Sequence, residues 1–217
     1  MDGNGRWAQS RGLQRNIGHK RGVFAVRSTV EKAAELGIEV LTLYCFSTEN
    51  WKRDPNEVHF LMDMFLQSLF DERPLILDNN IRFKLIGDRS KLSDELIKAA
   101  ELLEHDASVN TGMWLLLAIN YGGRAEVLRA VKEIVKSGID PDSINSDTMG
   151  NYLYTAGLPD PDMIIRTSGE MRLSNFLIWQ GAYSELIFIK KMWPDFSGKD
   201  LQGAIKIYNR RNRRFGG

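Results

Sequence analysis

Residues 38–46 read Ile-Glu-Val-Leu-Thr-Leu-Tyr-Cys-Phe, a short apolar run rich in β-branched and aromatic side chains. Such a run predicts a buried strand. A helical pattern precedes it over residues 20–36, with apolar side chains recurring on one face, and Gly37 is a natural helix stop. A helix that leads into a buried strand is typical of α/β domains.

The same alternation continues along the chain. Further apolar runs predict strands at residues 81–86, 113–119, 163–165 and 186–189. Helical periods predict helices at residues 93–107 and 124–136, and from Ser197 onward. The pattern therefore predicts an α/β fold, with a central mostly parallel sheet flanked by helices.

Length and composition favour one domain, residues 1–217, and a hydrophobic fraction of 43% with 26% charged residues is ordinary for a globular protein. No segment is apolar for about 20 residues, so no membrane-spanning helix is expected. No secretory signal is recognisable at Met1-Asp2-Gly3, which favours a cytoplasmic location. The single cysteine, Cys45, has apolar neighbours and reads as a buried packing thiol.

The charge balance of 29 basic against 28 acidic residues argues against a protein that binds a long polyanion. Any anion site must therefore be local. Arginine density marks two places, Arg166 with Arg172 and the tail with Arg210, Arg211, Arg213 and Arg214.

The first eight residues read Met-Asp-Gly-Asn-Gly-Arg-Trp-Ala, which predicts a short loop ahead of a helix. Gly3 and Gly5 would let backbone amides approach an anion, and Arg6 adds positive charge. Asp2 could hold a divalent cation that bridges to diphosphate oxygens. A glycine turn with a surface aspartate is an equal alternative.

Three further groups of polar residues suit an anion site. Arg15 and His19 precede the predicted 20–36 helix and could share an anion with its N-terminus. Residues 46–53 follow the 38–46 strand, where open α/β sheets bind ligands, although a capped turn is the alternative. Residues 166–176 place two arginines, Ser174 and a glycine after another strand, which favours phosphate binding.

Two features remain ambiguous from the residues alone. Glu185, ahead of the last apolar run, is either a surface charge or a metal ligand, in its own chain or across subunits. A helix opened by Pro55 carries more apolar residues up to Phe70 than one buried stripe needs, so it is either a core helix or the wall of an apolar channel.

Several chemistries are excluded. The sequence has no Asp-Asp-x-x-Asp cluster of the trans-prenyltransferase kind, no Cys/His metal spacing, no nucleophile elbow and no Walker loop. What remains is metal- and arginine-assisted ionisation or transfer of a phosphorylated substrate.

With these stretches in view, the chain resembles the cis-prenyltransferase family, most closely bacterial undecaprenyl diphosphate synthases. The matching stretches follow the family order and span essentially the whole chain: residues 1–8, 18–22, 46–51, 120–124, 162–180 and 193–196. The resemblance implies a six-stranded, largely parallel sheet, a hydrophobic tunnel and a homodimer. Family members normally have an apolar strand just before the equivalent of Met1, and this sequence lacks it.

The resemblance also implies residue roles. Asp2 would be the magnesium-associated carboxylate and catalytic together with Asn50, and Glu185 would help to hold Mg2+. The allylic diphosphate would contact Gly3, Asn4, Gly5, Arg6, Trp7 and Arg15. Residues near the reacting diphosphates would be His19, Ser47, Thr48, Glu49, Trp51 and Arg53. Isopentenyl diphosphate would contact Arg166, Arg172 and Ser174, and residues 213–216 would reach the partner subunit.

The implied activity is sequential condensation of isopentenyl diphosphate with an allylic diphosphate, farnesyl diphosphate, to a long cis-polyprenyl diphosphate. Undecaprenyl diphosphate, the carrier-lipid precursor for cell-wall synthesis, is the expected product, and membrane contact would be at most peripheral. Two alternatives stay open, a short-chain or branching synthase and a non-catalytic partner subunit. A nucleic-acid-binding role is the least favoured.

Overall fold

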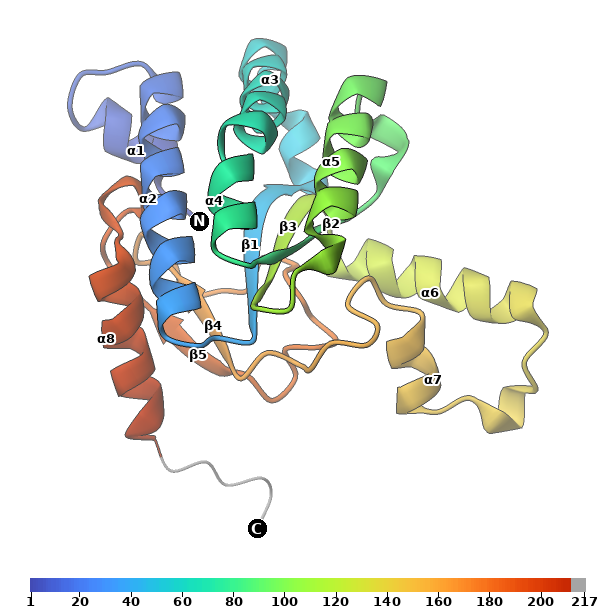
Figure 1. The fold of residues 1–217 in the computed structure, drawn as a ribbon. Helices are drawn as coiled ribbons and strands as arrows, with labels where there is room; N and C mark the ends of the chain where they lie inside the picture. Colours follow the sequence, from blue (N-terminus) through green and yellow to red (C-terminus); the bar gives the residue numbers. More distant parts are fainter. Residues whose placement is uncertain (212–217) are drawn as a thin grey trace. The chain divides into compact units, whose positions relative to one another are not determined.

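A computed structural model describes residues 1–211, and the chain divides into two compact units. Unit 1 contains residues 1–38 and 162–172 and the described residues from Tyr183 onward, and unit 2 contains residues 39–161 and 173–182. Figure 1 shows helices and strands in both units, and every strand pair in the described residues is parallel. The predicted α/β class and parallel pairing are confirmed.

The elements of unit 1 are α1 (Asn4–Gln9), α2 (Arg15–Glu35), β4 (Met163–Arg166), β5 (Glu185–Phe188), η5 (Trp193–Asp195) and α8 (Gly198–Asn209). Those of unit 2 are β1 (Val40–Ser47), η1 (Thr48–Lys52), α3 (Pro55–Asp71), α4 (Arg73–Asp78), β2 (Arg82–Ile86), η2 (Arg89–Lys91), α5 (Asp94–Asp106), η3 (Ala107–Val109), β3 (Trp114–Tyr121), α6 (Gly123–Ser137), η4 (Pro141–Ser143) and α7 (Ser146–Asn151).

The sheet of unit 2 has β3 at its centre, with β1 and β2 on either side. Its middle strand is almost fully buried and reads Trp-Leu-Leu-Leu-Ala-Ile-Asn-Tyr, as a strand covered on both faces should. Because Ser47 pairs with Tyr121, β1 and β3 end at the same edge. That edge carries η1 and the start of α6, which is where ligands bind in open parallel sheets.

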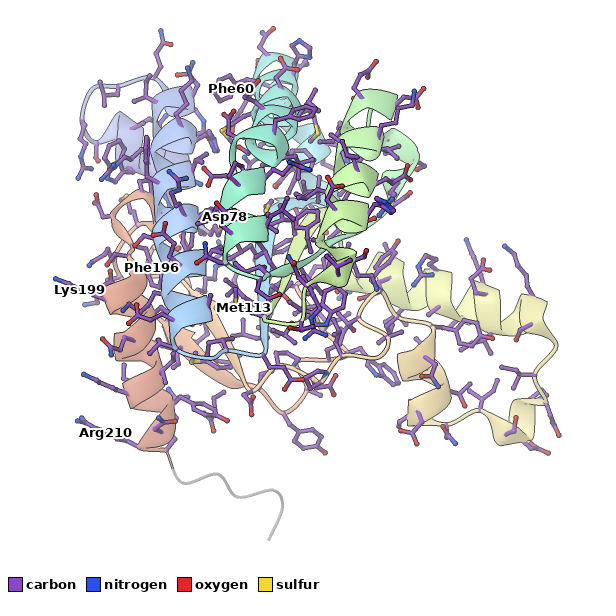
Figure 2. The ribbon with its side chains drawn as sticks, in the orientation of Figure 1. Phe60, Asp78, Met113, Phe196, Lys199 and Arg210 are labelled. Atoms are coloured by element: carbon purple, nitrogen blue, oxygen red, sulfur yellow. The ribbon has the colours of Figure 1, made fainter. Side chains whose placement is uncertain are left out.

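Unit 1 is built around α2, which packs against α1, α8 and η5. Trp193 of η5 is buried, donates a hydrogen bond from its ring nitrogen to the Gly22 carbonyl at 3.0 Å, and stacks on Phe196 at 5.2 Å. Lys199 and Arg210 project outward from the exposed side of α8 (Figure 2). The two strands of this unit, β4 and β5, pair in register from Met163 with Glu185 to Arg166 with Phe188.

Three expectations need correction. The helix predicted at residues 20–36 begins at Arg15, so Arg15 and His19 lie within α2 and not ahead of it. The predicted loop at residues 1–8 contains α1, whose helical residues include Gly5 and Arg6. Gly5, expected in the loop, is a helical residue of α1, and the Arg15 guanidinium lies close against it.

The sheet also differs from the implied single sheet of six strands. The described residues contain five strands, divided between a three-stranded and a two-stranded sheet. The other predicted strands agree with the structure to within about two residues, the usual scatter of element ends. Predicted segment 213–216 lies outside the described residues.

Two smaller findings bear on the sequence expectations. Among the described residues, no helix combines the length and apolar character needed to cross a bilayer. Cys45 lies in β1 and is half-buried, not fully buried as expected, and desolvation raises the pKa of its thiol to about 12, which keeps the thiol protonated at neutral pH.

We predict that Gly18→Ala destabilises the protein, because an added Cβ would lie 2.0 Å from the Asn4 carbonyl oxygen and would push α1 off α2. The matched control is Gly203→Ala in α8, where nothing lies within 4 Å of the added methyl group. This control should gain stability by about 0.5–1 kcal/mol, the helix propensity difference. Thermal unfolding measures both, and equal melting temperatures would contradict the packing described for Gly18.

Candidate active site

Asp2 is fixed by its backbone to the end of β4. The Thr167 hydroxyl oxygen accepts a hydrogen bond from the Asp2 N–H and donates one to the Asp2 carbonyl, both at 2.9 Å. The Asp2 carbonyl also accepts from the Trp193 N–H at 3.0 Å. Thr167 is only 2% exposed, so this anchor is shielded from water. Thr167 and Trp193 together therefore hold the Asp2 backbone at the end of β4.

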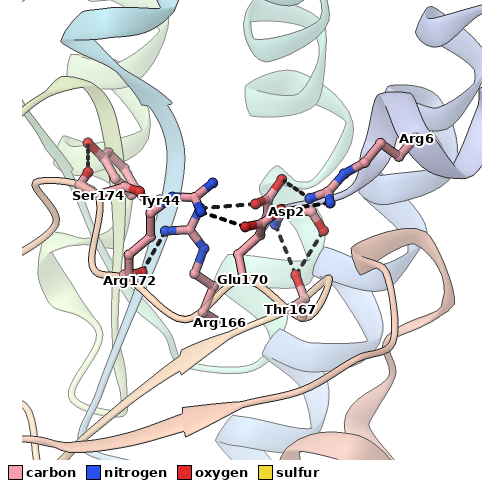
Figure 3. A network of polar contacts seen from close by, with 8 residues as sticks. All are labelled: Asp2, Arg6, Tyr44, Arg166, Thr167, Glu170, Arg172 and Ser174. Carbon is pink, nitrogen blue, oxygen red and sulfur yellow. Dashed lines mark hydrogen bonds and ion pairs between the residues drawn. The ribbon is translucent and has the colours of Figure 1, made fainter.

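The side chain of Asp2 belongs to a network that we call the Asp2 cluster (Figure 3). Its members are Asp2, Arg6, Arg166, Thr167, Glu170 and Arg172. Arg166 donates to one Asp2 carboxylate oxygen at 3.1 Å, and Arg6 lies 3.3 Å from the other. Glu170 accepts from Arg6 at 2.8 Å and from Arg172 at 2.5 Å.

The Asp2 cluster holds more positive than negative charge. Three guanidinium groups face two carboxylates, and the guanidinium of Arg166 also donates to the Arg172 carbonyl at 2.5 Å. Arg166 has a side chain only 16% exposed, whereas Arg172 is 61% exposed. The largely shielded Arg166 and the solvent-exposed Arg172 carry the same charge. Such a pair is suited to binding an anion that enters from solution.

Protonation of the two carboxylates reflects these contacts. Burial by itself raises the pKa of Asp2, but the hydrogen bond from Arg166 and the charges of Arg6 and Arg166 outweigh it and lower that pKa below the usual value. The hydrogen bond and charge of Arg172 likewise lower the pKa of Glu170. Both side chains are therefore ionised at neutral pH, as a metal ligand and an arginine partner need to be.

Other predicted residues of unit 1 surround α1. Gly3 has φ 105° and would meet the Ser168 hydroxyl at 3.0 Å if it carried a Cβ. The Arg15 guanidinium carbon lies 2.8 Å from the place where a Cβ of Gly5 would be, so Arg15 reaches back over α1. The Asn4 side-chain oxygen lies 2.5 Å from the place where a Cβ of Gly22 would be. His19 is 8% exposed.

Buried polar atoms mark the same place. The side-chain oxygens of Asn4 and Ser168 and the ring nitrogen of Trp7 are buried with no hydrogen-bond partner in the part of the chain that the structure describes. Leaving such atoms unsatisfied typically costs about 1–3 kcal/mol each. The Trp7 ring also carries the Arg11 guanidinium 4.3 Å above its centroid. A ligand or water that meets these atoms would recover part of that energy.

Glu185 does not join the Asp2 cluster within its own chain. It pairs with Met163 at the start of the β4–β5 sheet, while Arg166, the partner of Asp2, lies at the other end. Three residues of strand correspond to about 10 Å. The Glu185 carboxylate instead accepts a hydrogen bond from Arg211. The sequence suggested two metal ligands, Asp2 and Glu185. Of these, only Asp2 lies beside Arg6 and Arg166.

The predicted residues of unit 2 meet in and around η1. Asn50 accepts a hydrogen bond from the Ser47 N–H at 3.1 Å, which closes a capping box at the end of β1. Arg53 pairs with Glu57 of α3 at 3.1 Å. Thr48 lies against the start of α6, with its hydroxyl 2.7 Å from the place where a Cβ of Gly122 would be. The polar run after β1 is thus an ordered turn at the carboxyl edge of the sheet.

Two asparagines missed as site residues hold this turn. The Asn120 side chain accepts from the Trp51 ring nitrogen at 2.7 Å and donates to the Asp88 carbonyl at 2.7 Å. The Asn175 side chain donates to Glu49 at 2.9 Å. Both have positive φ, 49° and 64°, a conformation that asparagine tolerates better than most residues. An asparagine directly after a buried strand, or directly after Ser174, was the available signal.

Ser174 belongs to unit 2, whereas Arg166 and Arg172 belong to unit 1. Ser174 has φ 49°, and its carbonyl faces the Tyr44 hydroxyl at 3.5 Å, a weak contact that is also drawn in Figure 3. Thr167 and Glu170 were missed as well, because nothing in a Thr or a Glu within a polar loop signals a contact that spans more than 160 residues.

Whether a magnesium ion fits can be judged from the donors. The described residues contain no group of three His, Cys, Asp or Glu side chains that could enclose a metal ion. Mg2+ commonly takes only one or two carboxylates and fills its shell with water and substrate phosphates. The ionised, part-exposed Asp2 fits that mode of binding, with a side chain 34% exposed.

Comparisons with known proteins agree with one another. The family profile described as "Putative undecaprenyl diphosphate synthase" matches residues 1–216. An isoprenyl transferase of Clostridium tetani is 50% identical, over 100% of this chain and 87% of its own length. A lavandulyl diphosphate synthase from Lavandula x intermedia, solved with dimethylallyl diphosphate, has a TM-score of 0.96 at 37% identity, covering 100% of this chain and 95% of its own.

A probable undecaprenyl diphosphate synthase from Campylobacter jejuni is similar to a lesser degree. Its structure has a TM-score of 0.83 at 31% identity, covering 91% of this chain and 93% of its own. These similarities run through both units of the chain, so they do not rest on one motif.

We predict that Thr167→Val loosens Asp2, because the substitution keeps the side-chain volume and removes the hydroxyl that makes two backbone hydrogen bonds. The expected loss of unfolding free energy is about 1–3 kcal/mol. Thr167→Ser retains the hydroxyl and should lose less. If chemical denaturation shows Thr167→Val to be as stable as Thr167→Ser, the hydrogen bonds of the Thr167 hydroxyl do not stabilise the fold, and the prediction is wrong.

Proposed function

This chain belongs to the undecaprenyl diphosphate synthase family of prenyltransferases, and from that premise we propose its substrates and product. It condenses isopentenyl diphosphate repeatedly with an allylic diphosphate, farnesyl diphosphate, and forms a long cis-polyprenyl diphosphate such as undecaprenyl diphosphate. The observation that carries the proposal is the Asp2 cluster, in which three arginines outnumber two carboxylates.

The Asp2 cluster explains how a diphosphate is bound. Arg6 and Arg172 are held by Glu170, and Arg166 is held by Asp2, so the guanidinium groups are positioned before any ligand arrives. Each of these contacts joins one guanidinium nitrogen to one carboxylate oxygen, and diphosphate oxygens replace the carboxylates as acceptors, with forked contacts that the guanidinium groups can supply. Little reorganisation is then needed when charge develops on the leaving diphosphate, and this is the main source of stabilisation in such sites.

Asp2 is the residue proposed to hold Mg2+, together with oxygens of the diphosphate. When bound, the ion neutralises negative charge on the leaving group. Glu185 is the candidate for a ligand supplied across a subunit interface, since its own chain places it at the opposite end of β4 and β5 from Arg166.

The reaction balances without an added oxidant or reductant. The carbon–oxygen bond of the allylic diphosphate breaks, and its electron pair leaves with the diphosphate. The double bond of isopentenyl diphosphate supplies the electrons for the new carbon–carbon bond. Loss of a proton then forms the new cis double bond. Arg6, Arg166 and Arg172 hold a diphosphate during these steps, Asn50 is proposed as a further catalytic residue on η1, and the released diphosphate is a base that can accept the proton.

The wall for the growing chain is proposed on α3. Leu61 and Leu69 are buried at 3% and 4% exposure, which accounts for one packed stripe. The neighbouring Phe60, Phe65 and Leu66 are only half-buried although they are apolar. This excess over one stripe supports a surface that meets lipid.

A homodimer is part of the proposal. The outward face of α6 carries Leu128, Val131 and Val135, which are 62%, 45% and 74% exposed. Three apolar residues at helical spacing, on a helix that also buries Ala130 and Ile134, favour contact with a second copy of the chain.

A second candidate activity comes from the lavandulyl diphosphate synthase, whose fold is close to that of this chain at a TM-score of 0.96. Under this alternative the chain joins five-carbon units into a short branched product. Product sizing separates the two activities, because a long-chain synthase yields polyprenyl lipids from farnesyl diphosphate and the alternative does not.

We predict that the purified chain, given farnesyl diphosphate, labelled isopentenyl diphosphate and Mg2+, forms polyprenyl products, and that a chelator stops the reaction. Asp2→Ala should abolish nearly all turnover. Arg172→Ala should lower kcat/KM for isopentenyl diphosphate by about 10- to 100-fold, the effect of losing a charge-assisted bond of about 1.5–3 kcal/mol. Arg172→Lys should recover only part of the loss.

Lys199→Ala is the control for these variants, because Lys199 is exposed on α8. It should behave like the wild-type chain. A wild-type chain that forms no polyprenyl product, or an Asp2→Ala variant with full activity, would contradict the proposed function. The first result would favour a non-catalytic partner subunit.

We predict different outcomes for two leucines of α3. Leu69→Ala should destabilise the protein by about 2–5 kcal/mol, because Leu69 is 4% exposed and its loss leaves a cavity. Leu66→Ala should lose less stability and lengthen the product, and Leu66→Trp should shorten it. Melting temperatures and product chromatography decide, and unchanged product length in both Leu66 variants would remove this helix from the chain-binding surface.

A further inference from the structure

We propose that Asn175 is a positioning residue that locks η1 to the start of α6 and so presets the diphosphate-binding turn. The inference rests on the proposed function for its meaning, but the geometry that carries it lies entirely within unit 2. Nothing in the reaction requires Asn175 itself to touch substrate.

Three hydrogen bonds converge on Asn175. Its side-chain oxygen accepts from the Arg124 N–H at 2.9 Å, and its backbone carbonyl accepts from the Gly123 N–H at 2.7 Å. Its side-chain NH2 donates to Glu49 Oε1 at 2.9 Å. One residue therefore caps two N–H groups at the start of α6 and binds the carboxylate of η1 at the same time.

The backbone around Asn175 is held in an unusual conformation. Ser174, Asn175 and Leu177 all have positive φ, at 49°, 64° and 43°. Non-glycine residues adopt such angles only where the surroundings enforce them, and these positions cluster at functional sites. Here Phe176 stacks on Tyr44 at 4.5 Å, and Leu177 is 2% exposed. Packing thus fixes the direction in which the Asn175 amide points.

The fit between the segments leaves no room for a larger residue. A Cβ on Gly122 would lie 2.8 Å from the Asn175 side-chain nitrogen and 2.7 Å from the Thr48 hydroxyl. Because Gly122 has no side chain, η1 and the segment around Asn175 can both pack against the start of α6.

The bond to Glu49 has an electrostatic consequence. Burial tends to raise the pKa of Glu49, but hydrogen bonds from its own backbone N–H, from Asn175 and from Ser47 and Thr48 lower it overall. Glu49 is therefore ionised at neutral pH and is the acceptor for Asn175. Asn120 accepts a hydrogen bond from Trp51 of the same turn. Two asparagines therefore fix η1, Asn120 at Trp51 and Asn175 at Glu49.

This arrangement explains how Ser47, Asn50 and Ser174 are kept ready for diphosphates. Ser47 and Asn50 close the capping box of η1, and Ser174 directly precedes Asn175. Release of the Asn175 side chain would loosen all three without removing any of them. Rate loss would then come from misplacement, to which such sites are sensitive.

The test is Asn175→Asp, with and without Glu49→Gln. The aspartate tolerates positive φ and still accepts from the Arg124 N–H, but it has no NH2 and places a second carboxylate against Glu49. We expect kcat/KM to fall at least about tenfold, as for loss of a charge-assisted hydrogen bond. The double variant restores a donor opposite a carboxylate and should recover most of the loss, and Glu49→Gln alone completes the cycle.

Amide hydrogen exchange of residues 47–53 and 123–124 supplies a readout that does not depend on catalysis. Exchange should rise in Asn175→Asp and return toward the wild-type rate in the double variant. Wild-type exchange in Asn175→Asp, or no recovery in the double variant, would overturn the proposal. If the wild-type chain forms no polyprenyl product, the proposed function fails, and the exchange measurement still decides the role of Asn175.

Discussion

The arrangement of unit 1 around Arg6 and Arg166 depends on two hydrogen bonds between the Thr167 hydroxyl and the Asp2 backbone. They bring the first residues of the chain to the carboxyl end of β4, where Arg166 and Glu170 are positioned. Because the anchor uses backbone groups, the Asp2 side chain stays available for Arg166 and Arg6. A carboxylate placed in this way pairs with two arginines and is the ligand that we propose for a cation accompanying a diphosphate.

A comparable constraint acts in unit 2, where a short turn follows a buried strand. No residue of η1 is fully buried, and side-chain hydrogen bonds with Asn120 and Asn175 help to fix the turn. In both units the groups proposed to bind substrate are thus held by hydrogen bonds with neutral polar side chains, Thr167 in unit 1 and Asn120 and Asn175 in unit 2. Preorganisation of this kind is what electrostatic catalysis requires.

Much of the fold could be predicted from local pattern. The apolar runs predicted the strand positions, and the helix-stop role predicted for Gly37 agrees with its φ of 70°. Helix starts were harder, because Gly18 looks like a loop residue until its contact with Asn4 is known. The division of the strands into two sheets depends on pairing between distant residues, which a local pattern does not contain.

The candidate site could also be predicted only where local pattern was enough. Charged residues in polar stretches after strands, such as Arg166 and Arg172, can be recognised as anion-binding candidates from residue type alone. Thr167 and Asn175 do not, because their importance lies in partners that only the fold supplies. The separation of Glu185 from Asp2 likewise follows from the register of β4 with β5.

We propose that arginines of the Asp2 cluster exchange carboxylate partners for a diphosphate. The most direct test is a crystal structure of the chain with Mg2+ and an unreactive analogue of isopentenyl diphosphate. We expect the diphosphate on Arg166 and Arg172, with the bond from Arg172 to Glu170 broken. A diphosphate bound elsewhere, with the pairs among Asp2, Arg6, Arg166, Glu170 and Arg172 intact, would contradict it.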